Sequence, residues 1–316
     1  MIRTAGLVKR YGSFAAVDGI DLSIPRGEIY GFLGPNGSGK TTTIMMLLGI
    51  TRPTAGEIWL FDTRYSPRRL DLRRRIGVVP EKHPRGVWPW MTAREYLSLF
   101  ADLFRVPRPA ERIDALLEKV DLARFRAKRV REFSRGMLQK LSIIRALLHD
   151  PDILFLDEPI SGLDPLGIKQ VRDLILSENR EGRTIFISSH QLSEMEKICH
   201  RVAIIFRGRL MVEDTMRSLL SRMTADREVH VELESVPEDL PARMRELPFV
   251  RDAVALGGTL VVKLAKEGDF RKALSERLIR LDLVPLRIVE KVPSLEEAFI
   301  TITQENVDLL ARGGAQ

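Results

Sequence analysis

The chain has a single cysteine, Cys199, among its 316 residues, which excludes an internal disulfide framework and fits a reducing compartment. One thiol beside His200 supplies too few ligands for a metal site, so we expect Cys199 to be a core thiol. No apolar run approaches the ~20 residues that a membrane-spanning helix needs, and the first residues lack the apolar core of a signal peptide. With 44% hydrophobic and 29% charged residues, the composition is that of an ordinary soluble globular protein.

Negative charge is scarce in the first two thirds of the chain. Residues 1–220 contain 36 Lys/Arg and 26 Asp/Glu, whereas residues 221–316 contain 14 and 17. Arginine is concentrated within residues 68–75 and 124–135. A basic face of this kind serves nucleic acid, anionic lipid or phosphate ligands, or is simply a solvated helix face, and the composition leaves these alternatives open.

Strand-like and helix-like segments alternate along residues 1–220, and the length of the chain favours two domains. Residues 153–156 and 184–187 are largely continuous apolar runs, as expected for strands buried on both faces. The alternation predicts an α/β domain with a parallel sheet. We expect strands at residues 2–8, 17–23, 28–33, 57–61, 76–79, 153–156, 184–188 and 202–206, and helices from residue 40 and at 93–104, 110–120, 137–148 and 165–177.

The character of the sequence changes near residue 220. An alternating segment at 227–236, a glycine turn followed by Thr-Leu-Val-Val-Lys-Leu, and a last helix opening at Pro293-Ser294 predict a small α+β domain of residues 221–316. We place the boundary within residues 219–225. The sequence leaves two roles open for this domain, dimer stabilisation and regulation.

Glycine is concentrated between Leu33 and Lys40, where the chain fits the P-loop pattern G-x-x-x-x-G-K-[ST]. Glycine lets backbone N–H groups surround a phosphate, and the following helix directs its positive end at the anion. We expect Lys40 to reach the β- and γ-phosphates and Thr41 to ligate Mg²⁺. The predicted nucleotide-binding residues of this loop are Gly34, Pro35, Asn36, Gly37, Ser38, Gly39, Lys40, Thr41 and Thr42.

Two adjacent carboxylates follow the predicted strand 153–156. Asp157 suits Mg²⁺, directly or through water, and Glu158 suits polarising the water that attacks the γ-phosphate. The guanine-reading pattern N-K-x-D is absent, because no asparagine precedes a lysine.

The segment FSRGMLQKLSIIRALLHDPDILFLDEPISGLDP, residues 133–165, resembles the ATP-binding subunits of ABC transporters, and the resemblance extends over roughly residues 1–220. Phe-Ser-Arg-Gly-Met at 133–137 stands where the family usually has Leu-Ser-Gly-Gly-Gln, and residues 161–164 match its D-loop. The resemblance implies a P-loop ABC ATPase fold with ATP and Mg²⁺ as cofactors. It also implies catalytic roles for Glu158, His190 and Glu81, nucleotide contacts from Tyr11, Ser134, Gly136 and Asp164, and Mg²⁺ ligation by Thr41, Glu81 and Asp157.

Four positions depart from the family pattern, namely Phe133, Arg135 and Met137 in the segment 133–137 and Glu81 in the Q-loop. Glu81 replaces the usual glutamine of the Q-loop, and because export subunits for drugs and polysaccharides often carry glutamate there, the change favours export. Arg135 replaces a glycine. Its side chain either adds positive charge near the γ-phosphate or points elsewhere, and the sequence leaves both orientations open.

The resemblance implies that the helix start after Ser134 faces the P-loop of another subunit, so that ATP lies between two chains. One chain carries one P-loop and one Phe-Ser-Arg-Gly-Met segment, and a homodimer is the simplest arrangement.

Residues 82–135 correspond to a helical subdomain that in the family grips a separate membrane subunit. Exposed aromatics often anchor interfaces, so Trp88 and Trp90 either serve this contact or pack within the subdomain. The nearby arginines suit an anionic inner leaflet or acidic loops of the partner. Nucleic acid is not expected as a partner, because aromatics do not alternate with the arginines.

We therefore expect the ATP-hydrolysing subunit of an ABC exporter, held at the cytoplasmic face of the cell membrane by separate transmembrane subunits. The alternative is a soluble ABC ATPase that acts on ribosomes or nucleic acid. Members of that kind usually carry two ATPase halves, or long coiled-coil or zinc insertions, and neither is found in this sequence.

Overall fold

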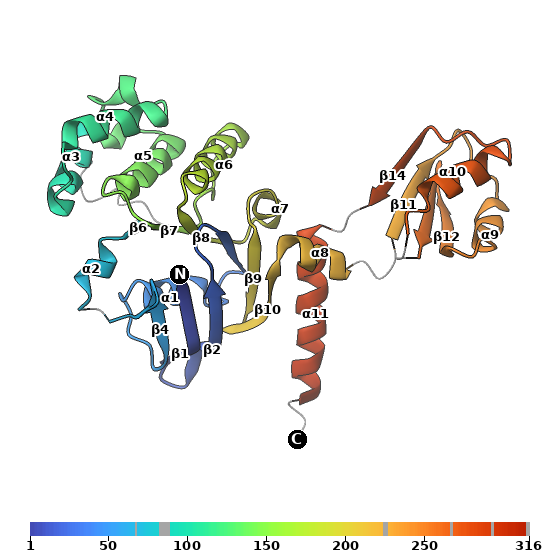
Figure 1. Cartoon of the computed structure of the whole chain (residues 1–316), viewed down its shortest axis with the longest axis horizontal. Coiled ribbons are helices and arrows are strands. Elements are labelled where there is room, and N and C mark those ends of the chain that lie inside the picture. The colour runs from blue at the N-terminus through green and yellow to red at the C-terminus, as the bar shows by residue number, and fades with distance from the viewer. Residues whose placement is uncertain (67, 82–88, 224–226, 266–267, 292–293, 314–316) are drawn as a thin grey trace. The chain divides into compact units, whose positions relative to one another are not determined.

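The computed structural model of the chain describes residues 1–66, 68–81, 89–223, 227–265, 268–291 and 294–313 (Figure 1). Its contacts form two compact units, one of Met1–Met216 with Ile302–Gln316 and the other of Arg217–Thr301. The predicted limits 1–220 and 221–316 stay a prediction; the contacts place the first division slightly earlier and group the last residues with the first unit.

A six-stranded sheet forms the centre of the first unit, in the order β10-β9-β3-β8-β7-β6. All pairs of neighbours are parallel except β9 and β10, which form a short hairpin. Every residue of β3, β7 and β8 is buried, because helices and a second sheet cover both faces. The strands are β3 (Ile29–Leu33), β6 (Ile76–Val79), β7 (Ile153–Asp157), β8 (Thr184–Ser189), β9 (Arg201–Phe206) and β10 (Arg209–Thr215). The predicted α/β fold with a parallel sheet is confirmed.

A second, antiparallel sheet has the order β2-β1-β4-β5, which the sequence did not reveal. Its first two strands pair through a tight hairpin with Tyr11 opposite Phe14, and so short a connection cannot make the crossover that parallel strands need. One cluster of buried side chains joins this sheet to the central sheet and to α1. The strands are β1 (Ile2–Tyr11), β2 (Phe14–Ile24), β4 (Ala55–Leu60) and β5 (Thr63–Arg64).

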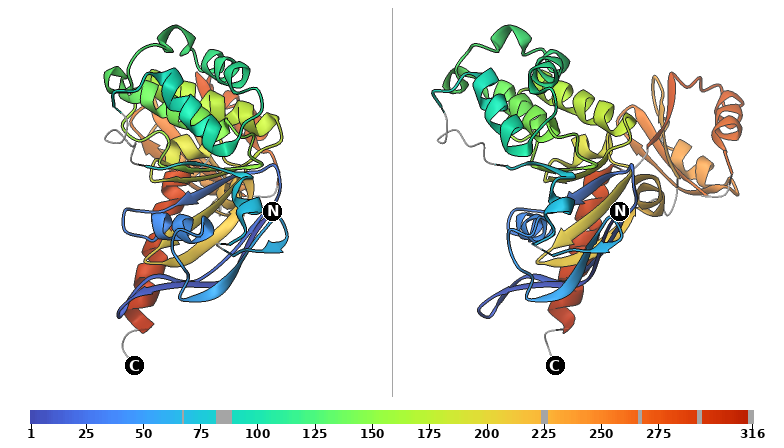
Figure 2. Two further views of the ribbon diagram at one scale, coloured as in Figure 1. Left: turned by 90° about the vertical axis from the view of Figure 1, so that its left-hand side faces the viewer. Right: turned by 60° about the vertical axis from the view of Figure 1, so that its left-hand side comes forward.

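Helices α3, α4 and α5 pack on one another beside the edge strand β6, as both views of Figure 2 show. The predicted helical subdomain, 82–135, contains α3 and α4, while its first residues, 82–88, lie outside the described part of the chain. No described helix is long and apolar enough to cross a bilayer. The helices of this unit are α1 (Lys40–Leu47), α2 (Leu70–Arg73), α3 (Ala93–Phe104), α4 (Pro109–Lys119), α5 (Arg135–Leu147), α6 (Pro165–Arg180) and α7 (Leu192–Glu196), with 3₁₀ turns at Ala123–Phe125 and Val130–Glu132.

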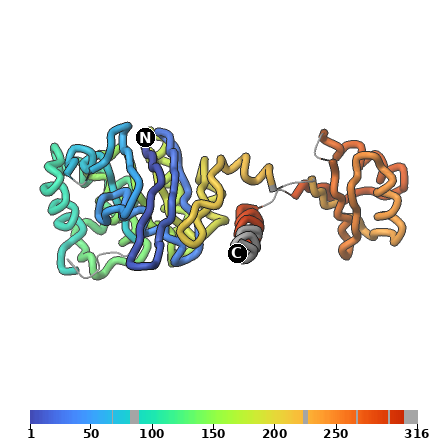
Figure 3. The backbone as a smooth tube through the Cα atoms, turned by 90° about the horizontal axis from the view of Figure 1, so that it is seen from below, coloured from blue at the N-terminus to red at the C-terminus, as the bar shows by residue number. Residues whose placement is uncertain are grey.

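The second unit contains a four-stranded antiparallel sheet of order β12-β13-β11-β14, whose backbone is the orange to red trace of Figure 3. Side chains of the sheet and of α9 and α10 form a hydrophobic core of their own. Its elements are β11 (Arg227–Glu232), α9 (Leu240–Arg245), β12 (Val250–Leu256), β13 (Thr259–Leu264), α10 (Arg271–Ile279) and β14 (Arg287–Lys291).

Two further helices contain the points where the units divide, α8 (Met216–Met223) and α11 (Leu295–Gly313). Ser294 caps α11: its hydroxyl accepts the N–H of Glu297, and the Glu297 carboxylate accepts the N–H of Ser294. The predicted opening of this helix at Pro293-Ser294 is therefore right to within two residues.

Candidate functional site

Four parallel strands bring the predicted chemistry to one edge of the central sheet. The P-loop follows β3, Glu81 follows β6, Glu158 follows β7 and His190 follows β8. Ligands of open α/β sheets bind at the carboxyl ends of the strands, where loops converge. The fold therefore gathers residues that are spread along the chain from the P-loop to His190.

An open cleft of 720 Å³ lies at this edge, within the size range of ligand sites. It contains most of the predicted nucleotide and catalytic residues together with three that sequence reasoning missed, Phe14, Ala16 and Ser161. The predicted residues that line it are Tyr11, Asn36, Gly37, Gly39, Lys40, Thr41, Thr42, Glu81, Glu158 and His190.

Lys40 begins α1 and is nearly buried, with 6% of its surface exposed. Its ammonium group donates to the carbonyl oxygens of Gly34 at 2.7 Å and Pro35 at 3.2 Å. It also lies 3.7 Å from a carboxylate oxygen of Glu158. Burial lowers the pKa of Lys40, and the negative charge of Glu158 opposes that shift. The loop thus holds its lysine inward even without a ligand.

Glycine is required at three points of the loop for different reasons. A Cβ on Gly34 would overlap the carbonyl oxygen of Ile205, and one on Gly39 would overlap that of Ala16. Gly37 has open space around it but a φ of +80°, a conformation that glycine adopts without strain. The loop consequently presents backbone groups rather than side chains to a ligand, as the P-loop prediction requires.

Two buried polar atoms in the described residues of this site have no hydrogen-bond partner, Ser38 Oγ and Glu158 Oε1. An unsatisfied buried polar group costs free energy. Ser38 is 3% exposed, so bulk water does not solvate its hydroxyl. The N-cap residue of α1, Gly39, provides no side-chain cap, and the first turn of the helix has no acidic residue. Donors that lack acceptors at this helix start suit a phosphate.

Asp157, like the neighbouring carboxylate, is buried. It accepts a short hydrogen bond from the Ser188 hydroxyl, and the nearby Thr41 hydroxyl also acts to lower its pKa. Burial raises the pKa of Asp157, and the bond from Ser188 opposes this shift. The negative charge of Glu81 acts on it as well. One hydroxyl and two carboxylates thus come together, and oxygen atoms are the ligands that Mg²⁺ prefers.

Glu158 is held in a left-handed conformation, with φ of +50°. Its backbone N–H donates to the carbonyl oxygen of Ser188 at 3.1 Å, which ties β7 to β8 at this point. Its carboxylate lies 2.9 Å from His190 Nδ1. A strained backbone at a residue whose side chain could take part in catalysis is typical of functional sites. The strain aims the carboxylate at Lys40 and His190 rather than at solvent.

Aromatic residues form the far side of the cleft. Tyr11 and Phe14 face one another across the β1–β2 hairpin and are 53% and 64% exposed. The ammonium group of Lys9 lies 5.0 Å from the centre of the Tyr11 ring. The turn at Gly12-Ser13 was the available signal that Phe14 would lie opposite Tyr11.

Six predicted nucleotide contacts do not line the cleft of their own chain. Three belong to the P-loop itself, namely Gly34, Pro35 and Ser38, and the other three are Ser134, Gly136 and Asp164. Ser134 is the N-cap of α5, where its hydroxyl accepts the N–H of Met137 at 3.2 Å. The predicted helix start at Met137 was therefore wrong by two residues, because this cap lets the helix begin at Arg135. Asp164 similarly caps α6 by accepting the N–H of Gly167 at 2.8 Å.

The side chain of Arg135 lies against the D-loop. A Cβ built on Gly162 would overlap the Arg135 guanidinium, so the cation covers that glycine. Gly162 has a φ of +65°. Of the two orientations left open by the sequence, the structure has the guanidinium on the D-loop of the same chain.

We expect Gly162→Ala to destabilise the chain through both the overlap and the left-handed φ. The backbone cost is about 1–2 kcal/mol, and the overlap adds to it. In an Arg135→Ala background only the backbone cost remains, so the two changes should be non-additive. Denaturant unfolding of the two single variants, the double variant and the unmodified chain measures this coupling. Equal costs of Gly162→Ala in both backgrounds would contradict the contact.

Comparison with known proteins places these features in one family. A family model described as ABC transporter matches residues 17–161. The bacitracin transport ATP-binding protein BcrA of Bacillus licheniformis is 47% identical over 214 residues, which cover 67% of this chain and 69% of that protein. The Nod factor export ATP-binding protein I of Burkholderia pseudomallei (strain 1710b) is 35% identical and covers 93% of this chain, with 94% of its own length matched.

Solved structures agree. The dimeric structure of a bacterial ABC transporter cassette, MJ0796, has a TM-score of 0.62 at 26% identity and covers 69% of this chain and 99% of that chain. The ADP conformation of another ATP-binding cassette, MJ1267, has a TM-score of 0.63 at 25% identity and covers 70% and 94%. With a P-loop, a cleft of this composition and relatives matched along their length, the chain belongs to the ABC transporter family as one of its ATP-binding, ATP-hydrolysing subunits.

Proposed function

We propose that two copies of this chain bind ATP and Mg²⁺ between them and transmit the resulting motion to separate membrane subunits of an exporter. The observation that carries the proposal is the division of the site within one chain. The cleft holds the P-loop and Glu158, while Ser134 and Gly136 lie at the start of α5 outside it. A second copy, related by two-fold symmetry, supplies that helix start to the cleft.

Each side chain of the site then has a separate role. Lys40 and the uncapped start of α1 bind the terminal phosphates, and Tyr11 stacks on the adenine. Glu158 accepts a proton from the attacking water, and His190 at 2.9 Å holds that carboxylate in place. On the partner's side, the start of α5 directs its N–H groups at the γ-phosphate.

Mg²⁺ fits the oxygen atoms of Thr41, Glu81 and Asp157. The Thr41 hydroxyl acts to lower the pKa of Asp157 and the charge of Glu81 to raise it, which supports placing both near that carboxylate. The described residues contain no group of three or more His, Cys, Asp or Glu that could hold a metal alone, so phosphate oxygens and water complete the set. The ion would neutralise charge on the phosphates, and Asp157 and Thr41 orient it.

Export is supported by what the relatives are called. One is a bacitracin transport protein and another a Nod factor export protein. Glu81, in place of the usual Q-loop glutamine, agrees with this direction.

Contact with a membrane subunit is supported by the surface around Trp90. This side chain is 61% exposed, so it does not pack within its subdomain, whereas Trp88 lies outside the described residues. The segment is tied to a basic one: the N–H of Val130 bonds to Met91 and the N–H of Arg131 to Pro89. An exposed aromatic beside arginines suits acidic loops or anionic headgroups at the inner leaflet.

Purification of the tagged chain from detergent-solubilised membranes of its source is expected to recover polytopic membrane proteins. Trp90→Ala should reduce this recovery several-fold, because interface anchors commonly contribute about 2 kcal/mol or more. Leu256→Ala serves as the matched control, since Leu256 is 65% exposed but belongs to the second unit. Recovery of ribosomal proteins or nucleic acid in place of membrane proteins would support the alternative function.

A further inference from the structure

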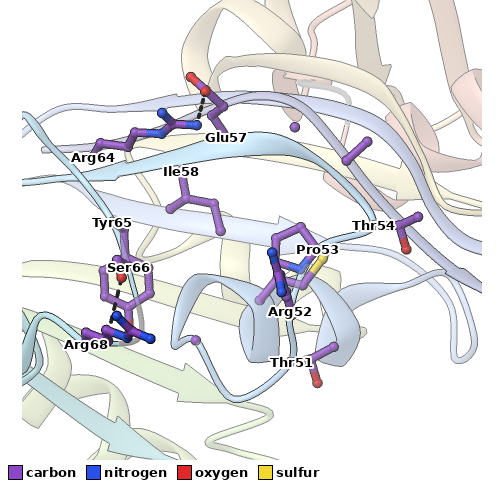
Figure 4. Close-up of a pocket in the computed structure, with 14 residues that line it drawn as sticks. Thr51, Arg52, Pro53, Thr54, Glu57, Ile58, Arg64, Tyr65, Ser66 and Arg68 are labelled. Carbon is purple, nitrogen blue, oxygen red and sulfur yellow. Dashed lines mark hydrogen bonds and ion pairs between the residues drawn. The ribbon is translucent and has the colours of Figure 1, made fainter.

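The first unit contains a second hollow, of 580 Å³, which shares no lining residue with the nucleotide cleft (Figure 4). It lies at the other end of α1, beyond Gly49. Its walls come from the loop after α1, from the beginning of β4 and from the segment that follows β5. The lining residues are Met46, Gly49, Thr51, Arg52, Pro53, Thr54, Ala55, Gly56, Glu57, Ile58, Arg64, Tyr65, Ser66 and Arg68.

One wall is preformed. The Tyr65 hydroxyl donates to the carbonyl oxygen of Leu48 at 2.8 Å and accepts from Arg73 Nε at 3.2 Å. Arg73 also donates to the carbonyl oxygen of Gly49 at 3.2 Å. A Cβ on Gly49 would come within 2.6 Å of the Tyr65 hydroxyl, so the ring has room only because residue 49 is glycine. Binding therefore need not order this aromatic ring.

The floor of the hollow is apolar. Met46 and Ile58 are 0% and 5% exposed and belong to the main hydrophobic core. Figure 4 shows Ile58 between Tyr65 on one side and Pro53 on the other. An aliphatic or aromatic group in this position would lie against the carbon atoms of these side chains.

The rim is cationic. Arg64 pairs with Glu57, which leaves Arg52 and Arg68 as two arginines whose guanidinium groups have no acidic partner among the described residues. The four charged lining residues thus have a net charge of +2. The hydroxyls of Thr51 and Ser66 line the same space and add donors.

We propose that this hollow binds an amphiphilic anion, that is, a phosphate or similar oxyanion joined to an apolar chain. Arg52 and Arg68, which Figure 4 shows on opposite sides of the hollow, attract the anionic group, since guanidinium groups match oxyanions in charge and geometry. Tyr65, Ile58 and Pro53 receive the apolar part above the buried Met46. A bare anion leaves the floor uncovered, and a neutral apolar compound leaves both arginines unused.

Isothermal titration with hexyl phosphate, below its micelle concentration, tests the proposal. Hexyl phosphate should bind at least tenfold more tightly than inorganic phosphate, because each buried methylene is worth about fourfold in affinity. Hexyl glucoside, which lacks the charge, should bind more weakly than hexyl phosphate by a similar factor. Equal affinity for the three compounds, or no binding of hexyl phosphate, overturns the proposal.

Three variants locate the binding. The double substitution Arg52→Gln with Arg68→Gln should weaken hexyl phosphate binding at least tenfold, and Ser66→Phe should do so by filling the space. Arg74→Gln is the matched control: this arginine is exposed in the same region but does not line the hollow. If the control weakens binding as much as the pair, the anion is held by general charge and the proposal fails.

Vesicles distinguish a lipid headgroup from a soluble amphiphile. If the ligand is a lipid, the chain should sediment with phosphatidylglycerol vesicles more than with phosphatidylcholine vesicles, and the paired arginine variant should lose that difference while Arg74→Gln retains it. If the variants behave alike with vesicles but differ with hexyl phosphate, the ligand is a soluble amphiphile. The absence of any difference between variants in both assays contradicts the site.

Discussion

Glu158→Gln is expected to slow ATP hydrolysis by about 10²- to 10⁴-fold, the usual contribution of a general base. Glutamine has the same shape but does not accept a proton from water at neutral pH. The surroundings should persist, because the backbone of residue 158 is fixed by Ser188 and by its place at the end of β7. Steady-state phosphate release with ATP and Mg²⁺ measures the effect.

The same substitution should leave ATP bound and thereby stabilise the proposed homodimer, which size-exclusion chromatography with ATP detects. Glu118→Gln is a suitable control, since Glu118 is an exposed glutamate of α4 away from the cleft. Hydrolysis at the unmodified rate in Glu158→Gln would show that another group activates the water.

Lys40→Ala is expected to weaken ATP binding by roughly 10- to 100-fold for each charge-assisted hydrogen bond that is lost. Lys40 is nearly buried at the first turn of α1, so no other side chain of the loop replaces its ammonium group. Equilibrium binding of a fluorescent ATP analogue measures the loss, with Lys272→Ala as a control because Lys272 is exposed in the second unit. Retained affinity would contradict the phosphate role.

Mixing this variant with a Ser134→Arg chain extends the test to the proposed composite site. Each variant alone should be inactive, since one lacks the lysine and the other blocks the helix start. In a mixed dimer, the P-loop of the Ser134→Arg chain meets the unmodified α5 of the Lys40→Ala chain, so random mixing restores about a quarter of the intact sites. When both chains also carry Glu158→Gln, the amount of ATP that stays bound measures the number of intact sites. No retained ATP in the mixture would contradict the two-chain site.

Local sequence was enough to predict the parts of the site that are continuous in the chain. The P-loop is a run of neighbouring residues, while Asp157 ends the apolar strand β7 and Glu158 follows it directly. The order of strands in the central sheet then places them together, which is a property of the fold class. The predicted ranges of β6 and α3 also agree with the structure to the residue, because each element is continuous in the chain.

Features that depend on strand register and long-range packing were not predictable. Phe14 enters the cleft because it pairs with Tyr11 across a hairpin, and the antiparallel sheet of β1, β2, β4 and β5 is defined by pairing rather than by composition. The contact of Arg135 with Gly162 joins the first residue of α5 to the D-loop, two segments that meet only in three dimensions. Similarly, β10 and β12 were missed because their mixed polar and apolar residues resemble loops.

The hydrogen bonds from Lys40 to the carbonyl oxygens of Gly34 and Pro35 have a consequence for turnover. An arriving phosphate exchanges one set of acceptors for another, so the net energy of binding is a difference between two satisfied states. The same exchange in reverse assists departure of the spent nucleotide, because the ammonium group regains its former acceptors as the anion leaves. In the proposed site, a lysine that has acceptors both before and after phosphate binding would let the loop bind ATP firmly and still release the product.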